Sequence, residues 1–335
     1  MNAWEQNQIG AYGAWAAEIV GRKVGSNSLR SGDFSDVDTW REAARKRVWE
    51  RLAPPELPEL PAVQVDAIGT YEGLSYERLS WQLPYGPRTE AVFLKPEGAT
   101  EPLPGVLALH DHGGMKYFGW RKIARIEEAL HPILQEHQES GYGGLAWANE
   151  IAKQGYAVLV PDTFTFGSRR VRIADVLPRI VGKGVDPSPD EPSEEIHAYN
   201  RWAGEHEHIM AKSLFSAGTT WPALFLRDDQ VALSVLGARP DVDSERLGCG
   251  GLSGGGLRTV FLAGMDDRIR CCFCAGFMTT WNDLVLYKNH THTWMTYVPL
   301  LPRELDFPEI LGLRAPKPTL VLHCTEDPLF TNDEV

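Results

Sequence analysis

The sequence has no long apolar run and few cysteines. None of its apolar stretches approaches the roughly 18 residues that a membrane-spanning helix needs. Its first residues carry neither the basic nor the apolar segment of a secretory signal peptide. The five cysteines are an odd number, which suits a reducing compartment better than a disulfide framework. We therefore expect a cytoplasmic protein with no membrane partner.

Positively charged residues are also fewer than negatively charged ones. The 335 residues include 33 lysines and arginines against 45 aspartates and glutamates, a net charge of −12. Nucleic-acid phosphates and anionic membrane surfaces would repel such a chain, so we expect neither as a partner. With 43% hydrophobic and 23% charged residues, the composition is that of a globular protein of one large domain or two small ones.

The first sixty residues differ in pattern from the rest. Apolar residues recur there at helical spacing, and a second helix is predicted to start at an N-cap, Asp36 or Asp38. A proline-rich connector follows over residues 53–61. We predict a helical extension with its connector over residues 1–60, followed by one domain over residues 61–335.

The main domain shows the pattern of alternating strands and helices. Three strands separated by turns come first, and then continuous apolar runs typical of a sheet buried on both faces. Their alternation with helical segments indicates a mostly parallel sheet with helices on both faces. A proline- and charge-rich stretch over about residues 167–220 is predicted to be an insertion over one end of the sheet. The predicted strands are 63–67, 76–83, 89–94, 105–109, 156–160, 247–251, 270–274 and 319–323, and the helical segments include 145–154, 226–236 and 257–263.

The central motif is a G-x-S-x-G pentad at residues 251–255, with Ser253 in its middle. Its glycines allow a sharp strand-to-helix turn that exposes the serine hydroxyl at the edge of a sheet. The helix that follows directs its free N–H groups to the same place. The pentad therefore predicts a nucleophilic serine, with a glycine-rich turn that carries no chemistry as the alternative.

Two further polar segments follow predicted strands. His110, Asp111 and His112 come directly after an apolar strand and before two glycines, where backbone N–H groups can stabilise an oxyanion. Metal binding by these three side chains is the alternative, but no further ligand cluster is evident, so we expect no metal and no other cofactor. Asp327 follows the strand 319–323 and is a candidate acid, with an ordinary Asp-Pro turn as its alternative.

Together these segments resemble the α/β-hydrolases, specifically the dienelactone hydrolase-like and acetyl xylan esterase-like branch. The resemblance implies an α/β-hydrolase fold in which Ser253 is the nucleophile. It also implies that Asp327, rather than Glu326 or Asp283, is the acid of the catalytic triad. The matching segments come in the family's order and are residues 106–114, 161–162 with 167–169, 241–255 and 315–330.

The resemblance assigns roles to backbone groups and to one arginine as well. The N–H of Gly254 and one from His112 or Gly113 would form the oxyanion hole. Arg169 would be a structural residue tied to Asp162, with anion binding as its alternative role.

One departure from the family concerns the catalytic histidine, which in the family follows the acid. No histidine lies between Asp327 and Val335, and the last helices and strand of the fold are absent too. We therefore expect a fragment whose base lies beyond Val335, with strand 319–323 covered on both sides in the whole protein. His290 and His292 precede the acid and could serve as the base only in an unusual arrangement.

These observations predict a serine hydrolase that cleaves a small-molecule carboxylic ester, of the acetyl, small-acyl or lactone type, through an acyl-enzyme on Ser253. Peptidase, lactonase or C–C hydrolase chemistry on the same fold, and a non-catalytic binding protein, are the alternatives. Dinucleotide binding through residues 248–250 fails because Ser253 occupies the third glycine position. The sequence does not determine the oligomeric state, and it allows a homo-oligomer. The insertion should form part of the substrate pocket, with four candidate wall residues: Met115, Phe118, Met278 and Trp281.

Overall fold

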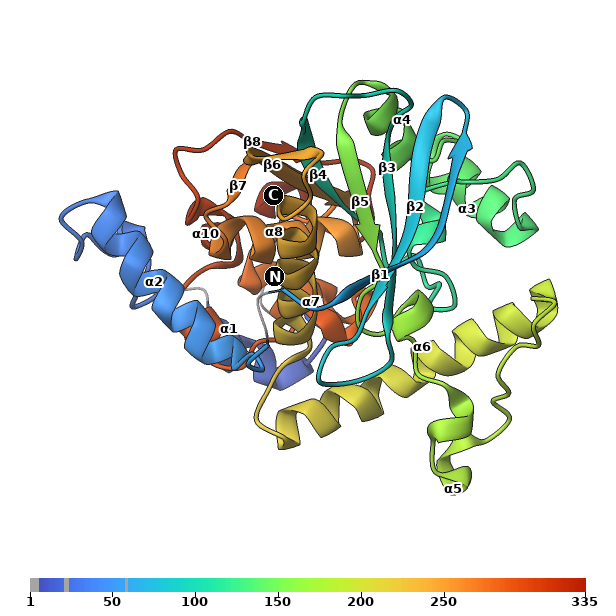
Figure 1. Cartoon of the computed structure of the whole chain (residues 1–335). Helices are drawn as coiled ribbons and strands as arrows, with labels where there is room; N and C mark the ends of the chain where they lie inside the picture. The colour runs from blue at the N-terminus through green and yellow to red at the C-terminus, as the bar shows by residue number, and fades with distance from the viewer. Residues whose placement is uncertain (1–5, 21–23, 58–59) are drawn as a thin grey trace.

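An eight-stranded sheet forms the middle of the molecule, in the order β1-β2-β3-β5-β4-β6-β7-β8 (Figure 1). The structure is a computed structural model that describes residues 6–20, 24–57 and 60–335, so the predicted extension lies partly outside the described residues. β1, β2 and β3 are antiparallel, β3 pairs antiparallel with β5, and the strands from β5 to β8 in that order are parallel. The strands are β1 Val63–Tyr71, β2 Leu74–Trp81, β3 Thr89–Pro96, β4 Leu103–Leu109, β5 Ala157–Pro161, β6 Val242–Leu252, β7 Ile269–Ala275 and β8 Thr319–Leu322.

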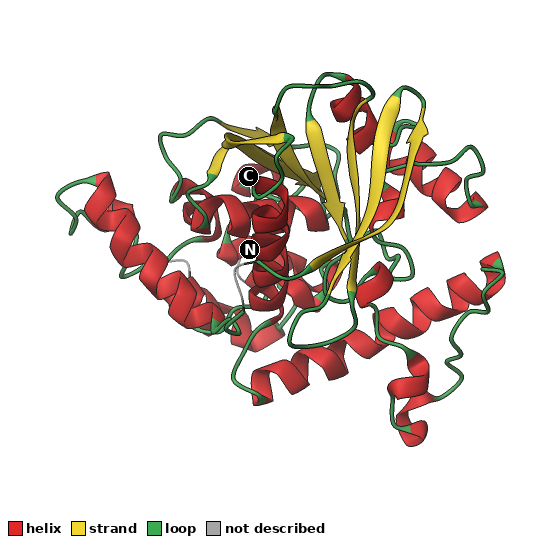
Figure 2. Ribbon diagram, viewed as in Figure 1, coloured by secondary structure: helices red, strands yellow, loops and turns green. Residues whose placement is uncertain are grey.

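Helices cover both faces of this sheet (Figure 2). Side chains alternate along each strand, so Leu107 and Leu109 of β4 pack against the layer that contains α7 and α8, whereas Ala108 packs against α4. The predicted α/β-hydrolase architecture is therefore confirmed. The helices are α1 Gly13–Val20, α2 Val37–Leu52, α3 Pro132–Tyr142, α4 Trp147–Lys153, α5 Pro178–Val181, α6 Ser193–Ser216, α7 Trp221–Gly237, α8 Gly254–Met265, α9 Trp281–Asp283 and α10 Phe307–Gly312.

The described part of the N-terminal extension packs onto the main domain. Asp36 caps α2 by accepting a hydrogen bond from the Thr39 N–H, as one of the two proposed caps predicted. Residues four apart on α2 face inward: Trp40, Ala44, Val48 and Leu52 are buried in the largest core cluster. The boundary at residue 60 stays a prediction, although α2 shares its core with the domain that follows.

The predicted insertion contains the short α5 and the 24-residue α6. α6 runs past the sheet in the lower part of Figure 1, with α5 below it. One stripe of α6 is buried, from Ile196 and Tyr199 to Ala203 and Ala211, at the spacing of a helix face. None of the described helices is long and apolar enough to cross a membrane.

β8 is an exposed strand. It lies at the end of the sheet and pairs with β7. Leu320, Val321 and Leu322 expose 53%, 41% and 48% of their surface. Within the described residues β8 therefore has one strand neighbour, and the expectation that it is covered on both sides in the whole protein stays a prediction.

Candidate active site

Ser253 occupies a strained turn between β6 and α8. Its φ of 54° and ψ of −117° lie where a side chain is unfavourable. The Ser253 N–H donates to the carbonyl of Ala275 at 2.8 Å, which ties the turn to the end of β7. A Cβ atom on Gly251 or Gly255 would overlap the Leu109 carbonyl, so only glycine lets the turn approach β4. This is the strand–turn–helix that the pentad predicts.

The loop after β4 crosses directly beside this turn. A Cβ atom added to Gly254 would lie 2.7 Å from the His112 nitrogen, so the two backbones are in contact. Gly113 and Gly114 adopt φ values of 54° and 66°, which lets the loop bend sharply there. The structure thus brings together the backbone groups proposed for the oxyanion hole. Because Gly254 is the first residue of α8, its N–H has no partner inside the helix.

The His112 side chain anchors the loop to the insertion. Its Nε2 lies 2.7 Å from a carboxylate oxygen of Glu207 on α6, and its Nδ1 accepts the Gly114 N–H at 3.0 Å. Burial, followed by the nearby Lys116 ammonium, lowers the pKa of His112, so the ring is neutral and donates through Nε2. Burial raises the pKa of Glu207, but the contacts with His112 and Lys116 outweigh it and bring that pKa to about 2.

Ser253 lines a cavity of about 210 Å³. Its walls are the loop after β4 at residues 112–114, the turn after β7, the segment from Thr291 to Thr296 and the chain that follows β8. Four large apolar side chains line it: Phe277, Met295, Leu329 and Phe330. A space of this size beside a serine suits a small acyl group.

None of the four predicted wall residues lines this cavity. Trp281 packs on Phe307 with ring centroids 5.2 Å apart and donates its indole N–H to the Leu305 carbonyl. Met278 is buried in the same core, since after β7 it is the preceding Phe277 that lines the cavity. The other two lie near the insertion: Phe118 is buried in its core cluster, and Met115 lines a neighbouring cavity.

His292 lines the Ser253 cavity. From the sequence it was expected to act as the base only in an unusual arrangement. Its Nδ1 donates to the Lys288 carbonyl at 3.0 Å, and its ring packs edge-on against Phe277 and Phe330. Its Nε2 is buried and has no hydrogen-bond partner. Burial lowers the pKa of His292, so this nitrogen carries a free lone pair at neutral pH.

The carboxylates near His292 are already hydrogen-bonded. Asp283 is fully buried and accepts from the hydroxyls of Thr279 and Thr331 at 2.8 and 2.5 Å. Asp327 is half-buried and accepts the Leu329 N–H at 2.9 Å. Within the described residues no histidine donates to Asp327, so its role as triad acid stays a prediction. Both carboxylates act on His292 through their charge, which raises its pKa against the effect of burial.

The predicted contact between Arg169 and Asp162 is wrong. The Arg169 guanidinium lies 3.5 Å from Asp228 and donates to the carbonyls of Tyr85 and Pro87. The Asp162 carboxylate instead accepts backbone N–H groups, from Trp120 and Ser168, at 2.7 Å each. Arg169 is therefore structural, as predicted, but through another partner.

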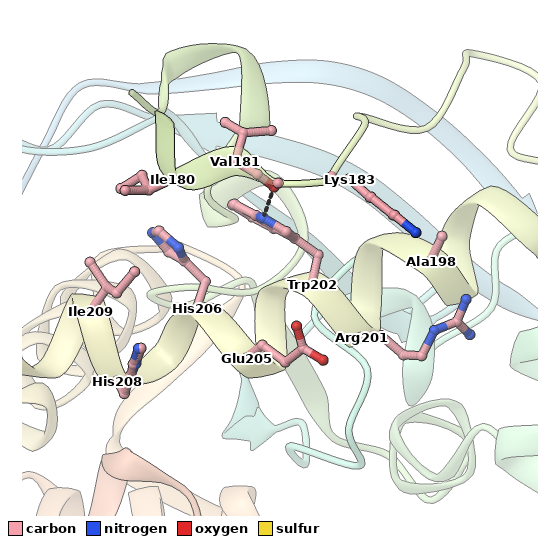
Figure 3. A pocket seen from close by; sticks show the side chains of 12 residues that line it. Ile180, Val181, Lys183, Ala198, Arg201, Trp202, Glu205, His206, His208 and Ile209 are labelled. Atoms are coloured by element: carbon pink, nitrogen blue, oxygen red, sulfur yellow. Dashed lines mark hydrogen bonds between the residues drawn. The ribbon is translucent and has the colours of Figure 1, made fainter. Parts of the chain in front are cut away.

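Two further cavities follow the face of α6. A cavity of about 510 Å³ lies between α5 and α6, where Trp202 stacks on His206 and donates its indole N–H to the Val181 carbonyl (Figure 3). A polar cavity of about 340 Å³ shares Gly113 and Gly114 with the Ser253 cavity and Arg201 with the cavity in Figure 3. The polar cavity therefore neighbours both of the others. Among the described residues, no group of three or more potential ligands is placed to hold a metal ion.

A mixed sheet of this order, with a serine in a left-handed turn between the inner strand β6 and a helix, defines the α/β-hydrolase fold, and this chain has it. No protein-family model matches the sequence. The chain is 26% identical over 292 residues to "Putative hydrolase YtaP" of Bacillus subtilis, covering 86% of this chain and 82% of that protein.

Solved structures share the fold. A protein described as a putative acetyl xylan esterase from Bacteroides fragilis superposes with a TM-score of 0.69 at 16% identity, over 93% of this chain and 74% of that one. A glucuronoyl esterase from Solibacter usitatus superposes with a TM-score of 0.59 at 15% identity, over 95% and 83%. At this level of identity the similarity establishes the fold.

Proposed function

We propose that this protein is a serine hydrolase that cleaves carboxylic esters of small acyl groups through an acyl-enzyme on Ser253. The observation that carries the proposal is the strained Ser253 turn, in contact with the His112 loop and open to a small, largely apolar cavity. The names of the structural neighbours, which are esterases, and of the B. subtilis relative, a hydrolase, support it.

The backbone supplies the electrostatic part of the mechanism. The hydroxyl of Ser253 attacks the ester carbonyl, and negative charge develops on the carbonyl oxygen. The N–H of Gly254, at the positive end of α8, and one from His112 or Gly113 receive this oxygen. Collapse of the tetrahedral intermediate releases the alcohol, and water then hydrolyses the acyl-enzyme.

The proton of the serine needs an acceptor. Of the two histidines that line the cavity, His112 has both ring nitrogens engaged, whereas His292 has a buried Nε2 without a partner. The Lys288 carbonyl fixes the tautomer that leaves this Nε2 as an acceptor. His292 is therefore our candidate base among the described residues. A base that follows Asp327, as the family resemblance implies, is the competing assignment.

The cavities indicate the shape of the substrate. The 210 Å³ space beside Ser253 accommodates a short acyl chain, and its apolar wall disfavours a charged one. The adjoining cavity beyond Gly113 and Gly114 is lined mainly by polar side chains, beside Met115 and Ile133: Glu136, His137, Ser140, His197, Asn200 and Arg201. We assign the acyl group to the first space and a polar alcohol to the second.

The test of the nucleophile combines labelling and turnover. The purified protein is treated with a fluorophosphonate probe and assayed on p-nitrophenyl esters from acetate to octanoate. Ser253→Ala should abolish labelling and lower kcat by on the order of 10⁴-fold or more, as for other triad serines. Ser213→Ala, on the exposed side of α6, is the matched control and should behave as wild type. Labelling that persists in Ser253→Ala would refute the assignment.

A second pair of variants decides between the two candidate bases. His292→Gln removes the free Nε2 and is expected to lower kcat by about 10²- to 10⁴-fold. His290→Gln changes an exposed histidine two residues away, outside the cavity, and should leave kcat unchanged. If His292→Gln keeps full activity, His292 is not the base and this assignment is refuted.

A further inference from the structure

Lys122 is a fully buried cation beneath the oxyanion loop. It ends the short turn Trp120–Lys122, and none of its side chain is exposed. Its ammonium donates to three backbone carbonyls of one loop, those of Asp111, His112 and Met115, the last two at 3.2 and 3.3 Å. On its other side the Phe166 ring centroid is 4.7 Å away. The three N–H donors of an ammonium match three carbonyls.

This arrangement fixes the direction of the peptide groups. In a trans peptide the carbonyl of one residue and the N–H of the next point in opposite directions. Because the carbonyls of Asp111 and His112 point at Lys122, the N–H groups of His112 and Gly113 point away from it. The His112 nitrogen indeed lies on the side of Gly254. Among the described residues, neither of these N–H groups donates to a protein acceptor.

The charge of Lys122 is compensated within the same loop. A carboxylate oxygen of Asp111 lies 3.6 Å from the ammonium. Tyr142 and His137, both on α3, donate to the other oxygen of Asp111 at 2.6 and 3.1 Å. Burial lowers the pKa of Lys122 to about 8, with Asp111 acting in the opposite direction, so the amine is mostly charged at neutral pH. An unpaired buried ammonium would be costly, and this pairing makes the site stable.

We propose that Lys122 is the positioning residue of the oxyanion hole, because it binds the carbonyl side of the 111–115 loop and thereby aims the N–H groups of His112 and Gly113 at the reacting oxygen. The proposal rests on the ester hydrolysis proposed above. Lys122 touches no substrate atom, and its effect passes entirely through the loop. Removal of the ammonium should therefore disturb the alignment of the loop, while the protein still binds its substrate.

The experiment compares Lys122→Met with wild type on p-nitrophenyl acetate. The expected result is a kcat lower by about 10- to 100-fold with KM within about threefold, because the hole acts on the transition state. Inhibition by a trifluoromethyl ketone, whose adduct with the serine needs the hole, should weaken by a similar factor. Lys122→Gln keeps an N–H₂ donor, so its kcat should lie between those of wild type and Lys122→Met. It replaces Lys122→Met in the test if that variant does not fold.

Val48→Ala is the stability control. It removes buried methyl groups from α2, outside the Ser253 cavity, and should destabilise the fold without changing kcat. If the wild type is active and both Lys122 variants keep its kcat and its affinity for the ketone, the positioning role is overturned and the proposed function is not. A kcat loss matched by Val48→Ala at equal stability would also overturn it. A wild type that neither hydrolyses esters nor reacts with the fluorophosphonate would overturn the proposed function together with it.

Discussion

Gly254→Ala tests the contact between the serine turn and the oxyanion loop most directly. The added methyl carbon would lie 2.7 Å from the His112 nitrogen and 3.1 Å from the His112 Cβ. Ordinary van der Waals contact begins near 3.4 Å, so the loop must retreat by about 0.7 Å. The obstacle is backbone, which is held by Lys122 and cannot rotate away as a side chain would.

In the proposed mechanism, a retreat of this size weakens the binding of the transition state. Donors of an oxyanion hole work at about 2.7–3.1 Å from the oxygen, so a displacement of about 0.7 Å removes most of one hydrogen bond. We expect kcat to fall by about 10²- to 10³-fold, or roughly 3–4 kcal/mol, with little change in KM. Steady-state hydrolysis of p-nitrophenyl acetate, together with the rate of fluorophosphonate labelling, measures the effect.

Gly204→Ala is the matched control. Gly204 lies within α6, and a methyl group there meets no atom within 4 Å. The change should leave kcat unchanged and stabilise the helix by up to about 1 kcal/mol. A folded Gly254→Ala protein with kcat within threefold of wild type would show that the backbones of Gly254 and His112 do not form the hole.

Two further variants test the anchoring of the loop and the acyl cavity. The pKa of Glu207 in the folded protein, about 2, lies below the ordinary glutamate value of 4.5. Its pairing with Lys116 and His112 therefore stabilises the fold above pH 4.5 and loses this effect as pH falls towards 2. Urea unfolding between pH 3 and 7 should therefore show a flatter acid decline for Glu207→Gln than for wild type, and equal slopes would contradict the pairing. Phe330→Ala should enlarge the Ser253 cavity and move the acyl preference from acetate towards butyrate or hexanoate, whereas Phe118→Ala, outside that cavity, should not. An acyl profile unchanged by Phe330→Ala would remove Phe330 from the acyl site.

Most strands of the fold were predictable because a strand that is buried on both faces has a continuous run of apolar residues in its sequence. All five residues of β5 are buried, and its sequence is an uninterrupted apolar run. α6 was harder to recognise, since prolines precede it and its buried stripe contains the polar His206 and Glu207 between apolar residues. The helical spacing of Ile196, Tyr199 and Ala203 is the signal that could have revealed it.

The geometry of the candidate site was predictable where it depends on residues that are neighbours in the chain. Ser253 and its glycines follow one another, and their turn is determined by residues within the pentad. Which side chains form the cavity wall depends instead on the direction of the chain after β7, which turns Phe277 rather than Met278 towards the serine. The contact between His112 and Glu207 joins residues 95 positions apart, and no local sequence pattern predicts it.

The left-handed backbone of Ser253 lowers the stability of the fold at the residue that we propose as the nucleophile. Holding a side chain at this φ and ψ costs on the order of 1–3 kcal/mol, which glycine would not incur. Ser253→Gly should therefore melt at a higher temperature than wild type while it loses all turnover, whereas Ser253→Ala keeps the strain and should gain little. With Ser253 in its proposed role, the protein cannot release this strain without losing its nucleophile, so thermostable variants must gain their stability elsewhere in the chain.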